Sequence, residues 1–345
     1  MGLISQIKVG NQNEPTFLEV STVSDSKNIV FFNGNFIPME DAKVGIMNHC
    51  FLYGLGVFEG IRGYYNDEHK QMYLFRMPEH HDRLIDSMKI MRMQLKYSPD
   101  ELSRIILEVL NRNSPEIDTY VRVCAYDDVN AIGVSLGEKT GFAIFTIPLG
   151  DYYHGKGNGL KVCVSSWRQI SDNAIPNRAK IVGAYASHAL VKSDALLSGF
   201  DEAIVLSEDG NVSEGSAMNL FVVKEGRVAT PMTSDRILQG VTRSTVIELA
   251  KTEFGKDVEV RPVSRSELYT ADELFLTGTA AQVTPILEVD KREVGTGQPG
   301  EFTMALREKY ISICRGERPG YQKWLTTVYP SSVAKPANAR VATKS

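Results

Sequence analysis

Residues 213–243 read SEGSAMNLFVVKEGRVATPMTSDRILQGVTR, and the organisation of the whole chain follows from them. Their first part places an acid, Glu214, beside small residues and just before an apolar run. Their last part places a glycine turn at Gly240 ahead of an amphipathic segment, residues 244–254. A buried carboxylate needs a cationic or donor partner, and the free N–H groups of a helix start bind anions. The stretch therefore predicts a site for one ligand that carries both a ring cation and a phosphate.

Pyridoxal phosphate has these two groups and also an aldehyde, which requires a lysine. Lys180 is the candidate, because the segment 175–182 around it is apolar and desolvation leaves an amine nucleophilic. Tyr185 follows five residues later, where it can bond a ring hydroxyl. Each residue alone has a commoner interpretation: Lys180 as a snorkelling lysine, Glu214 as a surface or helix-capping acid, Thr242 as an N-cap. Their combination favours the cofactor site.

Composition limits the class of protein. The 345 residues, 43% hydrophobic and 23% charged, predict two globular domains, since single cores stop growing at roughly 250–300 residues. The formal net charge of −4 argues against nucleic acid as the main partner, and no long apolar run predicts a membrane span. The histidines show no metal-binding pattern, and the four cysteines form no paired motif. We therefore expect a cytoplasmic protein with reduced thiols and no metal.

Changes of composition along the chain predict its domains. Residues 150–159 are rich in glycine and poor in apolar residues, which indicates a connection between two domains. The predicted divisions are an N-terminal arm at 1–27, a small α/β domain at 28–148, an interdomain loop at 149–159, a large β-rich domain at 160–329 and a flexible tail at 330–345.

Turn and periodicity signals predict the local elements. Asn33-Gly34 between two apolar runs predicts a hairpin, and Gly199 and Gly255 predict the ends of two helices. The predicted helices are 78–93, 99–111, 184–198, 244–254 and 302–314. The predicted strands are 120–125, 142–148, 160–167, 202–206, 258–263 and 273–276. Residues 46–63 are interpreted only as an aromatic segment interrupted by glycines.

Three further positions are candidates for binding anions. Arg83, on a predicted helix, has the donor geometry for a bidentate contact with phosphate, although a surface arginine is far commoner. Tyr120 and Arg122 share one face of a predicted strand, which suggests carboxylate recognition or, alternatively, an edge-strand charge. The loop 277–281 follows a predicted strand and can supply a second contact to the phosphate.

Taken together, these residues resemble the fold type IV pyridoxal-phosphate enzymes and, among them, the branched-chain amino acid aminotransferases. The class IV signature includes Glu214, Asn219, Leu220-Phe221, residues 228–230 and residues 238–243. The resemblance covers nearly the whole chain except its two ends. It implies a two-domain α+β fold like that of D-amino acid aminotransferase, with the cofactor between the domains. It also implies a homodimer in which the 51–58 loop of one subunit enters its neighbour's pocket.

The resemblance implies a role for each matching residue. Lys180 matches the catalytic Schiff-base lysine, Glu214 the partner of the ring nitrogen and Tyr185 the partner of the ring oxygen. The other cofactor-binding positions are Arg83, Leu238, Val241, Thr242 and Thr279. The substrate-binding positions are Tyr53, Phe58, Tyr120, Arg122, Tyr152 and Ala280. The Tyr120–Arg122 pair is typical of the branched-chain subgroup, in which the arginine binds the distal carboxylate of glutamate.

The implied reaction is transamination between a branched-chain L-amino acid and 2-oxoglutarate. Leu149 stands where many branched-chain enzymes have tryptophan, so the pocket wall is expected to differ. An aminotransferase for D-amino acids or (R)-amines stays open as an alternative. More distant alternatives are an aminodeoxychorismate lyase of the same fold and a cofactor-binding protein with a silent site. Ala184, Met218 and Gln282 also depart from frequent residues of the family, and none of them alters Lys180 or Glu214.

Overall fold

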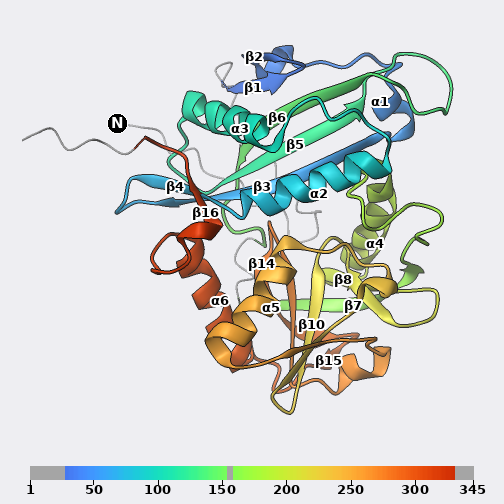
Figure 1. Cartoon of the computed structure of the whole chain (residues 1–345). Helices are drawn as coiled ribbons and strands as arrows, with labels where there is room; N and C mark the ends of the chain where they lie inside the picture. Colours follow the sequence, from blue (N-terminus) through green and yellow to red (C-terminus); the bar gives the residue numbers. More distant parts are fainter. Residues whose placement is uncertain (1–27, 154–157, 331–345) are drawn as a thin grey trace, which may run out of the picture.

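The protein has a two-domain α+β fold in which two β-sheets lie one above the other (Figure 1). The computed structural model describes residues 28–153 and 158–330. The arm predicted at 1–27 lies outside these residues, as do the tail from residue 331 and residues 154–157 of the predicted interdomain loop. No helix in the described part of the chain is long and apolar enough to cross a membrane.

The first sheet has seven strands in the order β16-β4-β3-β5-β6-β1-β2, and all its neighbours are antiparallel. Its strands are β1 (Ile29–Phe32), β2 (Asn35–Pro38), β3 (Gly56–Asn66), β4 (Gln71–Phe75), β5 (Thr119–Asp127), β6 (Thr140–Pro148) and β16 (Leu325–Thr327). The helices beside it are α1 (His49–Tyr53), α2 (Met77–Ile90) and α3 (Pro99–Asn113). Apolar side chains of α2 and α3 pack with those of β3 and β5 in one core.

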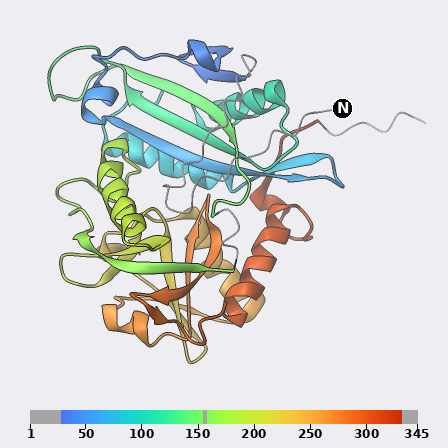
Figure 2. The ribbon, with the colours of Figure 1, turned by 180° about the vertical axis from the view of Figure 1, so that it is seen from behind.

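The second sheet is mixed and has nine strands in the order β12-β11-β10-β13-β14-β7-β8-β9, with β15 paired to β14. Its strands are β7 (Leu160–Arg168), β8 (Glu202–Leu206), β9 (Val212–Gly215), β10 (Asn219–Lys224), β11 (Arg227–Thr230), β12 (Val258–Val260), β13 (Glu273–Gly278), β14 (Gln282–Val289) and β15 (Arg292–Glu293). The helices are α4 (Tyr185–Leu197), α5 (Val241–Phe254) and α6 (Glu301–Cys314). Figure 2 shows α4 at one side of the junction between the sheets and α6 at the other. After α6 the chain returns to the first sheet, where β16 pairs with β4.

Local signals placed several elements correctly. The hairpin β1–β2 turns at Asn33 and Gly34, which have φ values of 47° and 100°, as a type I′ turn requires. Gly255 ends α5 with φ 62°. The start of α5 differs from the prediction, because the helix begins at Val241 rather than at residue 244. Gly240 is its extended N-cap residue, so the backbone N–H groups at 241 and 242 belong to the helix start.

The structure gives residues 46–63 elements that the sequence did not predict. The first part of this segment contains α1, and from Gly56 onward it belongs to β3, an eleven-residue strand that is buried along its whole length between β4 and β5. The glycines permit close approach, since a Cβ at Gly60 would overlap the ring of Tyr120, and one at Gly63 would lie 2.7 Å from the sulfur of Met72. A strand buried on both faces lacks the apolar–polar alternation that marks a half-buried strand.

Candidate active site

A cavity of about 290 Å³ lies between the two sheets. Every residue named above for the cofactor or the substrate lines it, except Tyr53. They are Phe58, Arg83, Tyr120, Arg122, Tyr152, Lys180, Tyr185, Glu214, Leu238, Val241, Thr242, Thr279 and Ala280. Tyr53 ends α1, and its hydroxyl accepts a hydrogen bond from the backbone N–H of Gly133 at 3.2 Å. Tyr53 thus lies apart from the cavity that the other predicted residues line.

Lys180 lies between the two domains and faces Tyr185. Its Nζ donates to the hydroxyl of Tyr185 at 2.7 Å and lies 4.9 Å from the centre of the Phe58 ring. The lysine backbone is held from both sides, because its N–H donates to Ser87 Oγ and its carbonyl accepts from the N–H of Phe58. Burial lowers the pKa of Lys180 to about 8, and the positive charge of Arg83 contributes in the same direction. The amine is thus largely neutral at mildly basic pH and can act as a nucleophile.

Glu214 lies on β9, one residue before its end, and is only 4% exposed. Its Oε1 accepts from Gln169 Nε2 at 2.8 Å, and its Oε2 accepts from Asn219 Nδ2 at 3.0 Å and from the N–H of Leu238 at 3.3 Å. Burial raises the pKa of Glu214 to about 8, and the hydrogen bonds from Leu238 and Gln169 and the charge of Lys180 offset it only in part. Among the described residues no cation forms an ion pair with this carboxylate, which suits a ligand that brings a protonated nitrogen of its own. The bond from Gln169 was missed by sequence reasoning.

The other end of the cavity suits an anion. Val241 and Thr242 begin α5, and no side chain in the described ranges caps this helix, so its first N–H groups can bind a ligand. A Cβ at Gly240 would overlap the amide oxygen of Asn219, so only glycine fits at this turn. Arg83 lines the same end and donates to the carbonyl of Gln239 at 2.9 Å.

Aromatic and cationic groups meet in a third part of the cavity. The guanidinium of Arg122 lies 4.2 Å from the centre of the Phe58 ring and 5.3 Å from that of Tyr120. Phe58 in turn packs edge-on against Tyr185, with ring centroids 4.7 Å apart. His188, which sequence reasoning missed, also lines the cavity and stacks on Tyr185 at 4.7 Å. This region can hold either an apolar side chain or a carboxylate.

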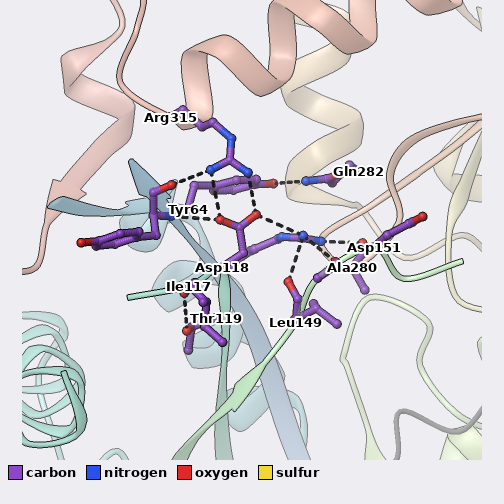
Figure 3. Close-up of polar contacts among 12 residues, drawn as sticks. Tyr64, Ile117, Asp118, Thr119, Leu149, Asp151, Ala280, Gln282 and Arg315 are labelled. Carbon is purple, nitrogen blue, oxygen red and sulfur yellow. Dashed lines mark hydrogen bonds and ion pairs between the residues drawn. The ribbon is translucent and has the colours of Figure 1, made fainter. Parts of the chain in front are cut away.

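The cavity wall is tied together by a polar network centred on Asp118. Figure 3 shows Asp118 facing Arg315, with the carbonyls of Leu149 and Ala280 beyond it. Arg62, 4% exposed, donates from NH1 to the carbonyl of Ala280 at 2.9 Å and from NH2 to that of Leu149 at 3.1 Å. The carboxylate of Asp118 binds Arg315 at 2.9 Å and Arg62 at 3.5 Å. Two residues that line the cavity are thus held by charges outside it, which sequence reasoning missed.

The donor set of the cavity fits pyridoxal phosphate. It combines an amine at Lys180 that can be neutral and a phenol at Tyr185 with a carboxylate at Glu214 and the start of α5. Among the described residues, neither a cation pairs with this carboxylate nor a side chain caps this helix. Within residues 28–153 and 158–330, no group of histidine, cysteine, aspartate and glutamate side chains could hold a metal ion.

Comparisons with known proteins agree with this geometry. The pattern of the family described as amino-transferase class IV matches residues 56–289. The chain is 45% identical over 307 residues to a probable branched-chain-amino-acid aminotransferase of Aquifex aeolicus, which covers 89% of this chain and 98% of that protein. It is 39% identical over 303 residues to the branched-chain-amino-acid aminotransferase of Escherichia coli K12, which covers 87% of this chain and 97% of that protein.

Solved structures are similar over the same extent. The branched-chain aminotransferase from Thermoproteus uzoniensis with norvaline has a TM-score of 0.83 at 39% identity, covering 87% of this chain and 99% of that one. A branched-chain amino acid aminotransferase of T.th. complexed with N-(5'-phosphopyridoxyl)-L-glutamate has a TM-score of 0.82 at 37% identity, covering 88% and 99%. On sequence and on fold, this chain belongs to the class IV aminotransferase family.

Proposed function

We propose that this protein is a pyridoxal-phosphate-dependent branched-chain amino acid aminotransferase. It transfers the amino group of a branched-chain L-amino acid to 2-oxoglutarate. The observation that carries the proposal is the convergence of Lys180, Tyr185 and Glu214 with the start of α5 on one cavity. The names of the relatives support the substrate class, and the solved relatives with norvaline and with a phosphopyridoxyl-glutamate adduct support the cofactor and both substrate types.

The residues that would hold the cofactor occupy distinct parts of the cavity. Lys180 would bind its aldehyde, Tyr185 its ring oxygen and Glu214 its ring nitrogen, while Leu238 would pack on the ring. The phosphate would be bound by Arg83, Val241, Thr242 and Thr279. When bound, the cofactor supplies an electron-withdrawing ring that stabilises negative charge at the substrate α-carbon.

The chain itself supplies proton transfer and charge control. Lys180, once its amine is released, can take the proton from the substrate α-carbon and return it, because its pKa of about 8 lies near operating pH. The hydroxyl of Tyr185, 2.7 Å away, orients the amine. Glu214 gains a cationic partner when the ring nitrogen is protonated, which favours its ionised form and keeps that proton in place. Gln169 and Asn219 hold the carboxylate in position for this contact.

The substrate region can serve both half-reactions. Phe58, Tyr120 and Tyr152 offer apolar surface for a branched side chain, and Arg122 offers a cation for the distal carboxylate of 2-oxoglutarate. Ala280 lies at the loop after β13, where its position is held by Arg62.

We also propose a homodimer in which Tyr53 reaches the partner's pocket. Two neighbouring segments, residues 44–52 and 132–136, carry large exposed apolar side chains, including Ile46 at 80%, Phe51 at 68% and Val134 at 82%. The bridge between Asn48 and Asn130 and the bond from Gly133 to Tyr53 hold the segments together. A patch of this kind marks an interface between proteins.

The domain boundaries and the compartment complete the proposal. A small domain at 28–148 and a large one at 160–329, joined by 149–159, would place the cavity at their junction, where ligand sites often form. The thiols of Cys50, Cys124, Cys163 and Cys314 are free, which favours a reducing compartment, and we place the protein in the cytoplasm.

A spectral titration of the purified protein with bound cofactor tests the function. We expect L-leucine, L-isoleucine and L-valine to convert the bound cofactor to its amino form, and 2-oxoglutarate to reverse the change. D-alanine and (R)-1-phenylethylamine should leave the spectrum unchanged. Conversion by these two compounds, with none by the branched-chain L-amino acids, would replace the proposal with a D-amino acid or (R)-amine aminotransferase. Release of pyruvate from aminodeoxychorismate without an amino acceptor would indicate a lyase.

A further inference from the structure

A second buried carboxylate, Glu59 on β3, lies behind the phosphate end of the cavity. It is 1% exposed, and both its oxygens bind Arg83: Oε1 accepts from Nε at 2.7 Å and Oε2 accepts from NH2 at 2.9 Å. His80, itself 2% exposed, contacts Oε2 through Nδ1 at 2.7 Å. Such a two-point contact determines the plane of the guanidinium as well as its position.

The donors of Arg83 can be counted. A guanidinium group has five N–H groups, and three of those of Arg83 are engaged, two by Glu59 and one by the carbonyl of Gln239. Within the described residues this leaves two N–H groups for a ligand. Gln239 directly precedes Gly240, the N-cap of α5, so the same contacts also join α2 and β3 to the helix start.

Glu59 also changes the electrostatic character of Arg83. Burial alone would raise the pKa of Glu59, but the charge and hydrogen bonds of Arg83 and the bond from His80 outweigh it and hold this pKa well below its usual range. Burial lowers the pKa of His80, and its Nδ1–H donates to the carboxylate at 2.7 Å. The Glu59–Arg83 pair therefore has no net charge, and it presents oriented donors rather than a free cation.

We propose that Glu59 is a positioning residue for the cofactor phosphate, which holds Arg83 so that its two remaining N–H groups serve the phosphate together with the start of α5. This inference rests on the proposed function, because it requires that pyridoxal phosphate binds in the cavity. It explains why a carboxylate is tolerated beside an anion site. Arg83 neutralises the negative charge of Glu59, and the ligand meets only those N–H groups of Arg83 that Glu59 does not engage.

The test compares two ligands that differ only in the phosphate. Apoprotein of wild type and of Glu59→Gln is titrated with pyridoxal phosphate and with pyridoxal, and binding is followed by absorbance. Glutamine keeps the size of the side chain but turns an amide NH₂ toward the donors of Arg83. We expect the Kd for pyridoxal phosphate to rise by about 10- to 100-fold, the range seen when groups that orient metal ligands are removed. The Kd for pyridoxal should stay unchanged.

Glu79→Gln is the matched control. Glu79, on α2, also binds an arginine, the N-cap residue Arg76, at 2.6 Å, but its side chain is 39% exposed and does not line the cavity. Both dissociation constants should equal those of wild type in this variant.

Each outcome decides between explanations. An equal rise of both dissociation constants in Glu59→Gln would show that Glu59 only supports the fold. Unchanged dissociation constants for both ligands would also overturn the proposal. If wild type binds pyridoxal phosphate no better than pyridoxal, the proposed function itself fails. If Glu59→Gln does not fold, Glu59→Asp takes its place, because aspartate keeps the charge on a shorter side chain. We expect Glu59→Asp to raise the Kd for pyridoxal phosphate and to leave the Kd for pyridoxal unchanged. Wild-type affinity for pyridoxal phosphate in that variant would overturn the proposal.

Discussion

Replacing Asp118 by asparagine should loosen the wall of the cavity from outside it. Asp118 accepts from the N–H of Tyr65 through Oδ1 at 3.0 Å, and its Oδ2 accepts from Arg315 at 2.9 Å and from Arg62 at 3.5 Å (Figure 3). Asparagine can keep the bond from Tyr65, but its NH₂ group then faces two guanidinium groups. Arg62 would stay buried without its counter-charge, although it is the group that holds Leu149 and Ala280.

The magnitude follows from the two contacts that are lost. A hydrogen bond to a charged group contributes about 1.5–3 kcal/mol, and the low end applies because the side chain of Arg315 is 33% exposed. Two such bonds give about 3 kcal/mol. With an unfolding entropy of about 2.1 cal/mol/K per residue, a chain of 345 residues loses about 4 °C in Tm.

The assay combines thermal unfolding with steady-state kinetics. We expect Asp118→Asn to lower the Tm by about 4 °C and to raise the KM for L-leucine more than it lowers kcat, since the wall shifts while Lys180 does not. Asp67→Asn is the control, because Asp67 forms an ion pair with Lys70 at the turn after β3 and its side chain is 83% exposed. A Tm for Asp118→Asn within about one degree of wild type would refute the reasoning.

Three further predictions concern the cavity itself. Lys180→Ala should abolish turnover and the near-visible absorbance of bound cofactor, and turnover at the wild-type rate would remove Lys180 from the mechanism. In apoprotein, acylation of Lys180 by a neutral reagent should rise with pH to a midpoint near 8, because burial lowers its pKa to about 8 and only the neutral amine reacts. Mass spectrometry would follow the labelling, and a rate still rising steeply above pH 10 would contradict that environment. Arg122→Ala should raise the KM for 2-oxoglutarate by roughly tenfold to a hundredfold, as expected for a lost charge-assisted contact, and that for L-leucine much less. Equal losses for both substrates would show that Arg122 has only a structural role.

The sequence by itself determined the chemical groups of the site and many of the local elements. Lys180, Glu214 and the turn at Gly240 could be named from their neighbours, because a desolvated amine, a lone acid and a glycine before a helix each leave a local pattern. The hairpin at Asn33 and Gly34 and the end of α5 at Gly255 follow in the same way from backbone conformations that few residues adopt.

Only the tertiary structure decided how these groups are supported. Glu59 and Arg83 are 24 residues apart, and Arg62 holds the carbonyl of Ala280 from 218 residues away. Neither contact leaves a periodic or local signal, because each depends on which strands become neighbours when the sheets form. The burial of β3 was missed for the same reason. In the sequence its glycines resemble loop residues, and only the packed ring of Tyr120 in the folded chain leaves no room for a Cβ at Gly60. Chemical identity is thus encoded locally, whereas orientation and affinity depend on contacts that exist only in the folded chain.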